Sequence, residues 1–169
     1  MKNLISNLAH AARNWRRQLV FGFVWAAIIT VGVALSLNAR GWHHDVHFVS
    51  ALIPFAVASF VAGYLTPLLA QTLVRNKPAL AQFSFFFAAL CILTVGLAAL
   101  IFAIHYRMNF PQWSAQFLSL EWIKRTFFTV LSAAYLFSVI GFRLLMPWGL
   151  IALFAVSIGF SRGWFQPSR

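Results

Sequence analysis

The chain alternates long apolar stretches with short polar segments, and this pattern predicts helices that cross a membrane. Uninterrupted apolar runs cover residues 18–37, 48–74 and 79–104. A helix rises about 1.5 Å per residue, so each run can cross a hydrocarbon core of about 30 Å. Small residues at helical spacing in the first two runs favour close helix packing. The third run contains four phenylalanines that we expect to face lipid: Phe83, Phe85, Phe86 and Phe87.

A fourth apolar stretch, residues 126–160, is too long for one straight crossing and too short for two comfortable ones. As a single helix it would extend about 52 Å. Arg143 and Pro147 interrupt it, and each half has about 17 residues, the lower limit for a crossing. We expect a hairpin that turns near residues 143–147, whose second half is either a fifth crossing or a re-entrant half-helix. The alternative is one helix that is broken at this point. The predicted fold is therefore an all-α integral membrane protein, a bundle of four to five transmembrane helices.

The polar segments between these runs predict the topology. Residues 1–17 form a basic, amphipathic segment, residues 18–165 a single transmembrane domain, and residues 166–169 a short tail. Basic residues gather on the cytoplasmic side of membrane proteins. Lys and Arg before the first run and between the second and third outnumber those in the other two loops, which places residues 1–17 in the cytoplasm. Short loops without an organelle-targeting pattern favour the bacterial inner membrane.

The composition removes several classes of function. The chain has 13 Lys and Arg but only two acidic residues, Asp45 and Glu121, and 62% of its residues are hydrophobic. The basic residues lie between apolar runs, so they suit anionic lipids and not nucleic acid. No carboxylate falls within a predicted span, which argues against a proton relay. The sequence has no phosphate-binding loop, no serine-hydrolase or zinc-protease motif, and Cys91 has no second cysteine to pair with. We therefore expect a protein that is not an enzyme.

Four of the five histidines lie at positions predicted on one side of the membrane. His43, His44 and His47 surround Asp45 after the first run, and His105 ends the third. Imidazole and carboxylate groups bind Zn²⁺, Cu²⁺ or Ni²⁺, so these five residues form a candidate transition-metal site. Haem is the weaker alternative because no histidine pair lies deep in the spans. The same residues also suit an ordinary polar loop at the membrane surface.

Arg143 is the second candidate site residue. An arginine at the centre of a membrane helix costs about 2.5–3.5 kcal/mol on insertion scales and needs an anion. We expect Asp45 and Glu121 on the opposite side of the membrane from Arg143. The predicted contact is therefore an anion, a lipid phosphate or an acidic residue of a partner, unless Arg143 reaches water from a turn.

These observations favour a small accessory or assembly subunit that packs against a larger membrane complex. Its expected partners are the lipid bilayer with its anionic lipids and either a partner subunit or a second copy of the chain. One alternative is a small transporter or channel component for an anion or lipid. The other is a membrane protein that binds a transition metal or haem through the histidines.

Overall fold

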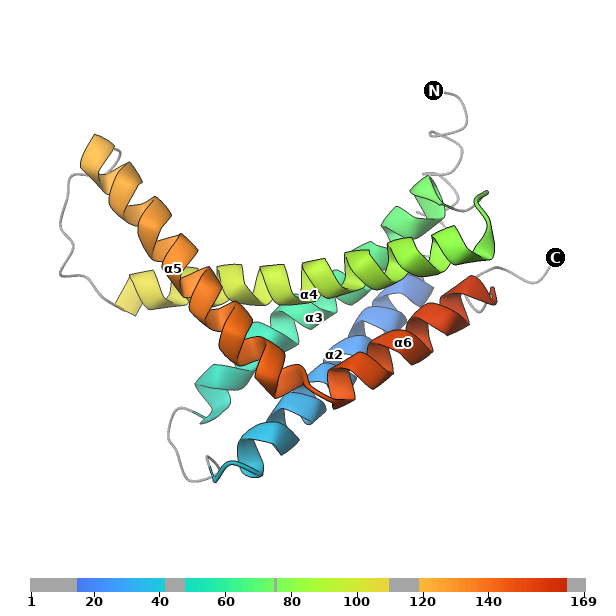
Figure 1. Ribbon diagram of the computed structural model, residues 1–169, viewed down its shortest axis with the longest axis horizontal. Helices are drawn as coiled ribbons and strands as arrows, with labels where there is room; N and C mark the ends of the chain where they lie inside the picture. The colour runs from blue at the N-terminus through green and yellow to red at the C-terminus, as the bar shows by residue number, and fades with distance from the viewer. Residues whose placement is uncertain (1–14, 42–47, 75, 110–118, 164–169) are drawn as a thin grey trace.

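The computed structural model describes residues 15–41, 48–74, 76–109 and 119–163, and its regular elements are all helices (Figure 1). Four of them are long and apolar enough to cross a membrane, whereas the last is shorter. The predicted all-α membrane bundle is confirmed, and the chain is a multi-pass membrane protein. The helices are α2 (Trp15–Asn38), α3 (Phe48–Leu73), α4 (Ala79–Asn109), α5 (Leu120–Leu145) and α6 (Trp148–Ser161).

Helices α2, α3 and α4 form the three-helix core, in which α3 packs against both α2 and α4. Two glycines bring α2 and α3 together: a Cβ atom on Gly63 would lie 2.9 Å from the Cα of Gly22. The small residues Ala58 and Ala62 on α3 are fully buried as well. Small side chains let helix backbones approach closely, so the predicted small-residue faces are real packing surfaces. Helix α3 also continues beyond Pro67, which does not end it.

Aromatic and polar contacts complete the core. The indole nitrogen Nε1 of Trp25 on α2 donates a buried hydrogen bond of 3.1 Å to Oγ1 of Thr94 on α4. The ring of Phe86 lies 6.0 Å from that of Phe21. Phe86 is fully buried, so the expectation that it faces lipid is wrong. Phe86 is buried because the last helix covers it: the Phe160 ring stacks on the Phe86 ring with centroids 4.3 Å apart.

Helices α5 and α6 form the C-terminal arm, which bends at the break between Leu145 and Trp148. The break confirms the predicted turn near residues 143–147. The two helices diverge from it instead of packing along each other as in a tight hairpin (Figure 1). Helix α6 has 14 residues and is about 21 Å long, shorter than a hydrocarbon core of about 30 Å. It agrees with the half-helix alternative.

Helix α5 packs obliquely on the three-helix core, mainly against α4 (Figure 1). Its first turns are on the side where α4 ends (Figure 1). Its Phe137 ring packs 4.9 Å from Phe55, near the start of α3, and 5.4 Å from Phe102, near the end of α4. Its last turn contacts Ser36 and Arg40, at the end of α2. Leu145, the last residue of α5, lines a cavity with Thr94 and Val95 in the middle of α4. Helix α5 therefore runs from the end of α4 toward the middle of the core, and α5 and α6 both pack along α4.

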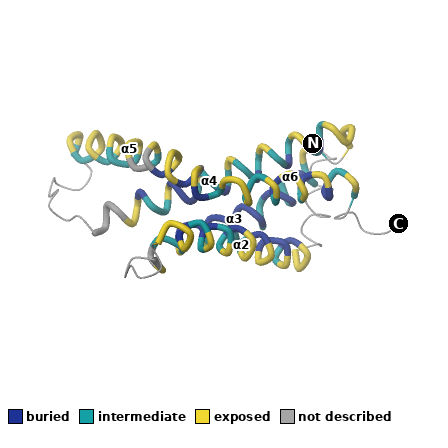
Figure 2. The backbone as a smooth tube through the Cα atoms, turned by 60° about the horizontal axis from the view of Figure 1, so that its bottom comes forward, coloured by how far each residue is buried: buried dark blue, intermediate teal, exposed yellow. Residues whose placement is uncertain are grey.

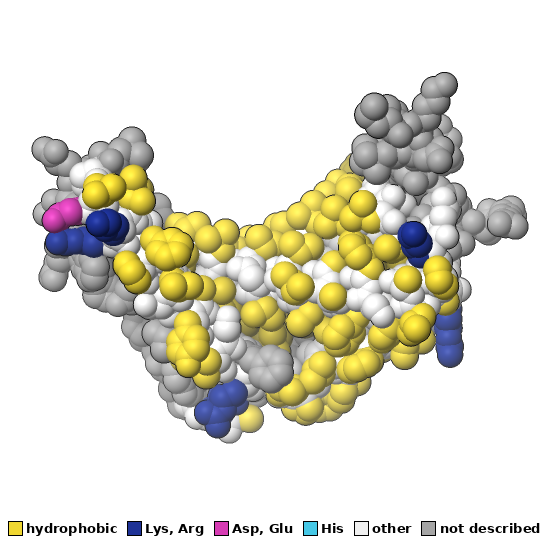
Figure 3. All heavy atoms as spheres, turned by 45° about the horizontal axis from the view of Figure 1, so that its top comes forward, with side chains coloured by type: hydrophobic (Ala, Val, Ile, Leu, Met, Phe, Trp, Pro, Cys, Tyr) yellow, Lys and Arg dark blue, Asp and Glu magenta, His cyan; other side chains and the backbone are white. Residues whose placement is uncertain are grey.

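The surface and the burial pattern separate the two parts. In Figure 3, hydrophobic side chains form a band across the middle of the visible face, and Lys and Arg side chains lie toward its ends. This distribution suits a hydrocarbon layer between two polar boundaries. In Figure 2 the core helices turn buried residues toward each other, whereas the first half of α5 is mostly exposed.

Candidate functional site

The junction between α5 and α2 is the most distinctive polar feature among the described residues. The last carbonyl groups of a helix have no partner within the helix, and hydrocarbon offers no water to replace one. Here α2 provides the partners. The Ser36 hydroxyl donates to the Leu144 carbonyl oxygen at 2.8 Å, and Nη2 of Arg40 donates to the Arg143 carbonyl oxygen at 3.2 Å. These two bonds fix the end of α5 against the end of α2.

The same contacts bring two arginines together. Arg40 and Arg143 are both exposed, and the Arg40 guanidinium bonds the backbone of Arg143. The carboxylate that the structure describes, Glu121, is 3.7 Å from Arg125 at the other end of α5. Glu121 is 22 residues from Arg143, about 33 Å along a helix. Among the described residues, therefore, no carboxylate neutralises the Arg40–Arg143 pair.

This arrangement corrects the expected position of Arg143. From the sequence, Arg143 was expected across the membrane from the loop that follows the first span, the loop that contains Arg40. The structure places the two residues in contact instead. The physical reason is that α5 crosses the core obliquely and finishes beside the end of α2, where Ser36 and Arg40 bond the carbonyl groups of its last turn. Whether Arg143 contacts an anion, a lipid or a partner stays a prediction.

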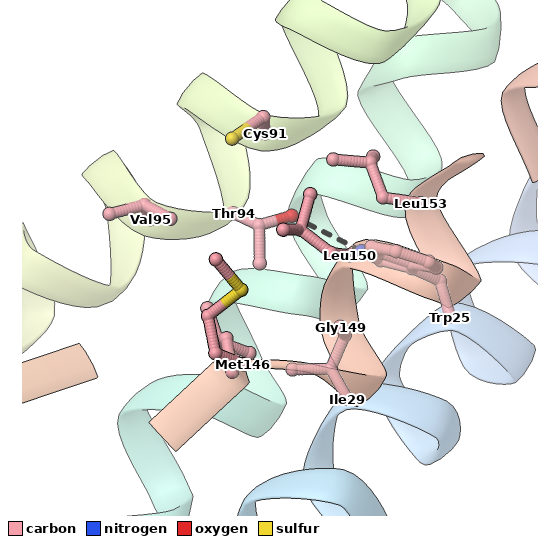
Figure 4. Close-up of a pocket in the computed structure, with 10 residues that line it drawn as sticks. Trp25, Ile29, Cys91, Thr94, Val95, Met146, Gly149, Leu150 and Leu153 are labelled. Atoms are coloured by element: carbon pink, nitrogen blue, oxygen red, sulfur yellow. Dashed lines mark hydrogen bonds between the residues drawn. The ribbon is translucent and has the colours of Figure 1, made fainter. Parts of the chain in front are cut away.

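A cavity of about 50 Å³ lies beside the break in the arm, between α2, α4 and α6 (Figure 4). Its wall is apolar apart from the Trp25 and Thr94 groups, and these are hydrogen-bonded to each other. Such a cavity can contact hydrocarbon but offers an anion no donor. Its lining residues are Trp25, Ile29, Cys91, Thr94, Val95, Leu145, Met146, Gly149, Leu150 and Leu153.

The histidine site is only partly within the described residues. His105 is exposed, one turn before the end of α4. His43, His44, Asp45 and His47 lie outside the described residues, so their grouping with His105 stays a prediction. In the described part of the chain, no three His, Cys, Asp or Glu residues gather in a way that could hold a metal ion.

Sequence reasoning missed Arg40 and Ser36. Arg40 served only as one positive charge in a loop, and Ser36 had no assigned role. Each lies more than 100 positions from its partner in α5, because the two hydrogen bonds join residues 103 and 108 apart. No periodic pattern links residues so far apart. The one available signal was a basic residue directly after a span, at the depth where anionic groups occur.

Comparisons with known proteins add no family to this description. No family model, curated protein or solved structure matches the chain. The fold and its charged junction are therefore the basis for any functional proposal.

Proposed function

We propose that the protein is a non-enzymatic accessory subunit of a larger membrane complex, and that its partner binds the outward side of α5. One observation carries the proposal. Five exposed residues, three or four apart, form a single stripe on α5, and four of them are polar. We call this stripe the outer face of α5: Glu121, Arg125, Phe128, Ser132 and Tyr135.

A helix that touches only lipid should not present such a stripe. On α2 the exposed residues are the apolar ones that lipid favours, such as Val24 and Val31. Tyr135 and Phe128, by contrast, are 69% and 65% exposed among polar neighbours. Aromatic and arginine side chains on one surface are typical of the centres of protein interfaces. A partner protein suits this mixture better than bare hydrocarbon or water.

The proposed topology puts the start of this face at the membrane boundary. The first turns of α5 lie on the side where α4 ends, so we place them at headgroup level on the periplasmic side of a bacterial inner membrane, and the rest of α5 together with α6 completes the crossing. The chain before α2 and after α6 is then cytoplasmic. The cytoplasmic segments carry eight Lys and Arg and the other end carries five, as the positive-inside rule requires. The eight are Lys2, Arg13, Arg16, Arg17, Arg75, Lys77, Arg162 and Arg169.

Cysteine labelling tests this topology. In a Cys91→Ala background, single cysteines at Asn76 and Ser161 should react with a membrane-impermeant thiol reagent from the cytoplasmic side only. A cysteine at Asn38 should react from the opposite side. Labelling of Asn38 and Asn76 from the same side would contradict the arrangement of the core, whereas labelling of Ser161 with Asn38 would contradict that of α6.

Photo-crosslinking tests the partner. A photoreactive amino acid at Tyr135 should give one adduct of defined mass in native membranes, and the same group at Val24, exposed on α2, should give none. The double variant Phe128→Ala, Tyr135→Ala should reduce partner retention about 30-fold, as expected when about 2 kcal/mol of interface energy is lost. The control is the double variant Val24→Ala, Val31→Ala, which should retain the partner as the wild type does.

Two results would overturn the accessory role. The first is full retention of the partner by the double variant. The second is an adduct of twice the chain mass, which would identify a second copy of this chain. Anion flux from the purified protein in liposomes would instead favour the transport alternative.

A further inference from the structure

We propose that Arg40 and Arg143 together bind a phosphate group, that of an anionic phospholipid, where the end of α5 meets the end of α2. A hydrogen bond between residues 103 positions apart brings the Arg40 guanidinium to the backbone of Arg143, so two exposed arginines are neighbours at this junction. Among the described residues, no carboxylate compensates their charge, since Glu121 is at the far end of α5 beside Arg125. An anion from outside the chain would do so.

The donor geometry suits phosphate. A guanidinium group has five N–H donors in a planar fork, and phosphate accepts them in bidentate fashion. Arg40 spends a donor on the Arg143 carbonyl oxygen, which orients its side chain and leaves other donors available. Arg143 contributes only its backbone to that bond, so its own side chain is not needed to hold the junction. One arginine is thus fixed in place and the other is available to close on the ligand.

The depth of the pair suits a lipid better than a free ion. Helix α2 has 24 residues, about 36 Å, enough to cross the hydrocarbon, and Arg40 follows its end by two residues. Arg40 therefore lies at the level of lipid headgroups. About one turn before the two arginines, the exposed side chains are apolar: Leu35 on α2, and Val139 and Ile140 on α5. A phospholipid would place its phosphate on the arginines and its acyl chains on these residues.

Binding of defined lipids to the purified full-length protein tests the proposal. Native mass spectrometry in detergent would measure the affinity for phosphatidylglycerol, phosphatidylcholine and inorganic phosphate. Arg143→Gln and Arg40→Gln should each weaken phosphatidylglycerol binding about fivefold, the factor for one basic residue at an anionic surface. Arg143→Lys should lose less, because it keeps the charge but not the fork. The matched control is Arg162→Gln, which changes an exposed arginine after α6 and should bind as the wild type does.

The comparisons between ligands identify the source of the phosphate. Failure of millimolar inorganic phosphate to displace phosphatidylglycerol supports the lipid, whereas displacement at matched concentration supports a free-phosphate site on the same arginines. Unchanged binding in Arg143→Gln and Arg40→Gln would overturn the proposal. An equal loss in Arg162→Gln would overturn it too, because binding would then follow net charge alone. The lipid-binding test uses the protein without any partner. The lipid site can therefore be absent while the accessory role holds, and the accessory role can be wrong while the lipid site exists.

Discussion

The three-helix core and the C-terminal arm place their polar residues in opposite directions. In the core, Gln18, Ser59, Thr66 and Thr94 are buried, and the exposed surface is apolar. Along α5 the buried residues are apolar, and the polar residues are exposed beside apolar ones such as Phe127 and Leu131. Both regions are apolar enough to cross a membrane when hydropathy is averaged along each helix. The direction of the polar side chains, and not their number, distinguishes a helix that faces hydrocarbon from one that faces a polar surface or a partner.

The two regions are also held together differently. The core depends on continuous close packing, seen where Gly22 and Gly63 let α2 and α3 approach. The arm packs mainly on α4, and specific contacts fix its position on the core. Phe137 packs α5 on the core, Ser36 and Arg40 bond its end, and Phe160 stacks α6 on α4. We therefore expect substitutions in the core to change global stability, and substitutions at the attachment points to loosen the arm alone.

The largest effect is expected for Gly63→Val. The added Cβ atom would lie 2.9 Å from the Gly22 Cα and 3.0 Å from the Trp25 Cβ, so the helices must separate. Overpacking of this kind costs about 1–3 kcal/mol, and we expect the upper part of that range because a backbone atom blocks relaxation. Thermal unfolding in detergent measures the loss.

Gly96→Val is the matched control for that substitution. Gly96 is exposed on α4 and has no atom within 4 Å of a built Cβ, so the variant should unfold within about 0.5 kcal/mol of the wild type. Equal losses for the two variants would contradict the tight contact between α2 and α3. They would also remove the contrast between a close-packed core and a loosely attached arm.

A smaller effect is expected for Thr94→Val. The substitution removes the acceptor of the Trp25 Nε1 hydrogen bond and leaves that donor unpaired in the interior. We expect a loss of about 1–2 kcal/mol in the free energy of unfolding. A double-mutant cycle with Trp25→Phe should show coupling of about 1 kcal/mol.

Thr129→Val also replaces a hydrogen-bonded threonine by valine, but in the C-terminal arm, and it serves as the comparison for Thr94→Val. The Thr129 hydroxyl bonds the Arg125 carbonyl within α5, so its loss leaves no distant partner unpaired and should cost less than about 0.5 kcal/mol. A coupling near zero between Trp25 and Thr94 would show that their bond contributes nothing to core stability. A larger loss for Thr129→Val than for Thr94→Val would reverse the proposed ranking of core and arm.

The sequence was sufficient to predict the parts of the fold that depend on local patterns. The three core helices follow the apolar runs, and the break near Pro147 follows from the length limit on a crossing. It was harder to predict from the sequence which face of each helix is buried and which faces lipid. Phe86 belongs to a run of phenylalanines that suits lipid, and only its contact with Phe160, 74 positions away, explains why it is buried.

The candidate site was less predictable because it depends on where α5 lies. From sequence, α5 has the length and hydropathy of a crossing helix, so Arg143 was placed across the membrane from Arg40. The contacts of Phe137 and Leu144 with the ends of the core helices reverse that assignment.

The smallest effect is expected for Ser36→Ala, which removes one attachment point of the arm. The Ser36 hydroxyl bonds the Leu144 carbonyl across the junction, and interhelical bonds of this kind contribute about 0.6 kcal/mol. Amide hydrogen exchange should therefore become about threefold faster around residues 143–149 and stay unchanged in α2–α4. Ser138→Ala is the matched control, because that hydroxyl bonds only the Ala134 carbonyl in its own helix. Faster exchange throughout the core in Ser36→Ala would mean that arm and core unfold as one unit. Equal, unchanged exchange in both variants would mean that the hydrogen bond to α2 does not hold α5 in place.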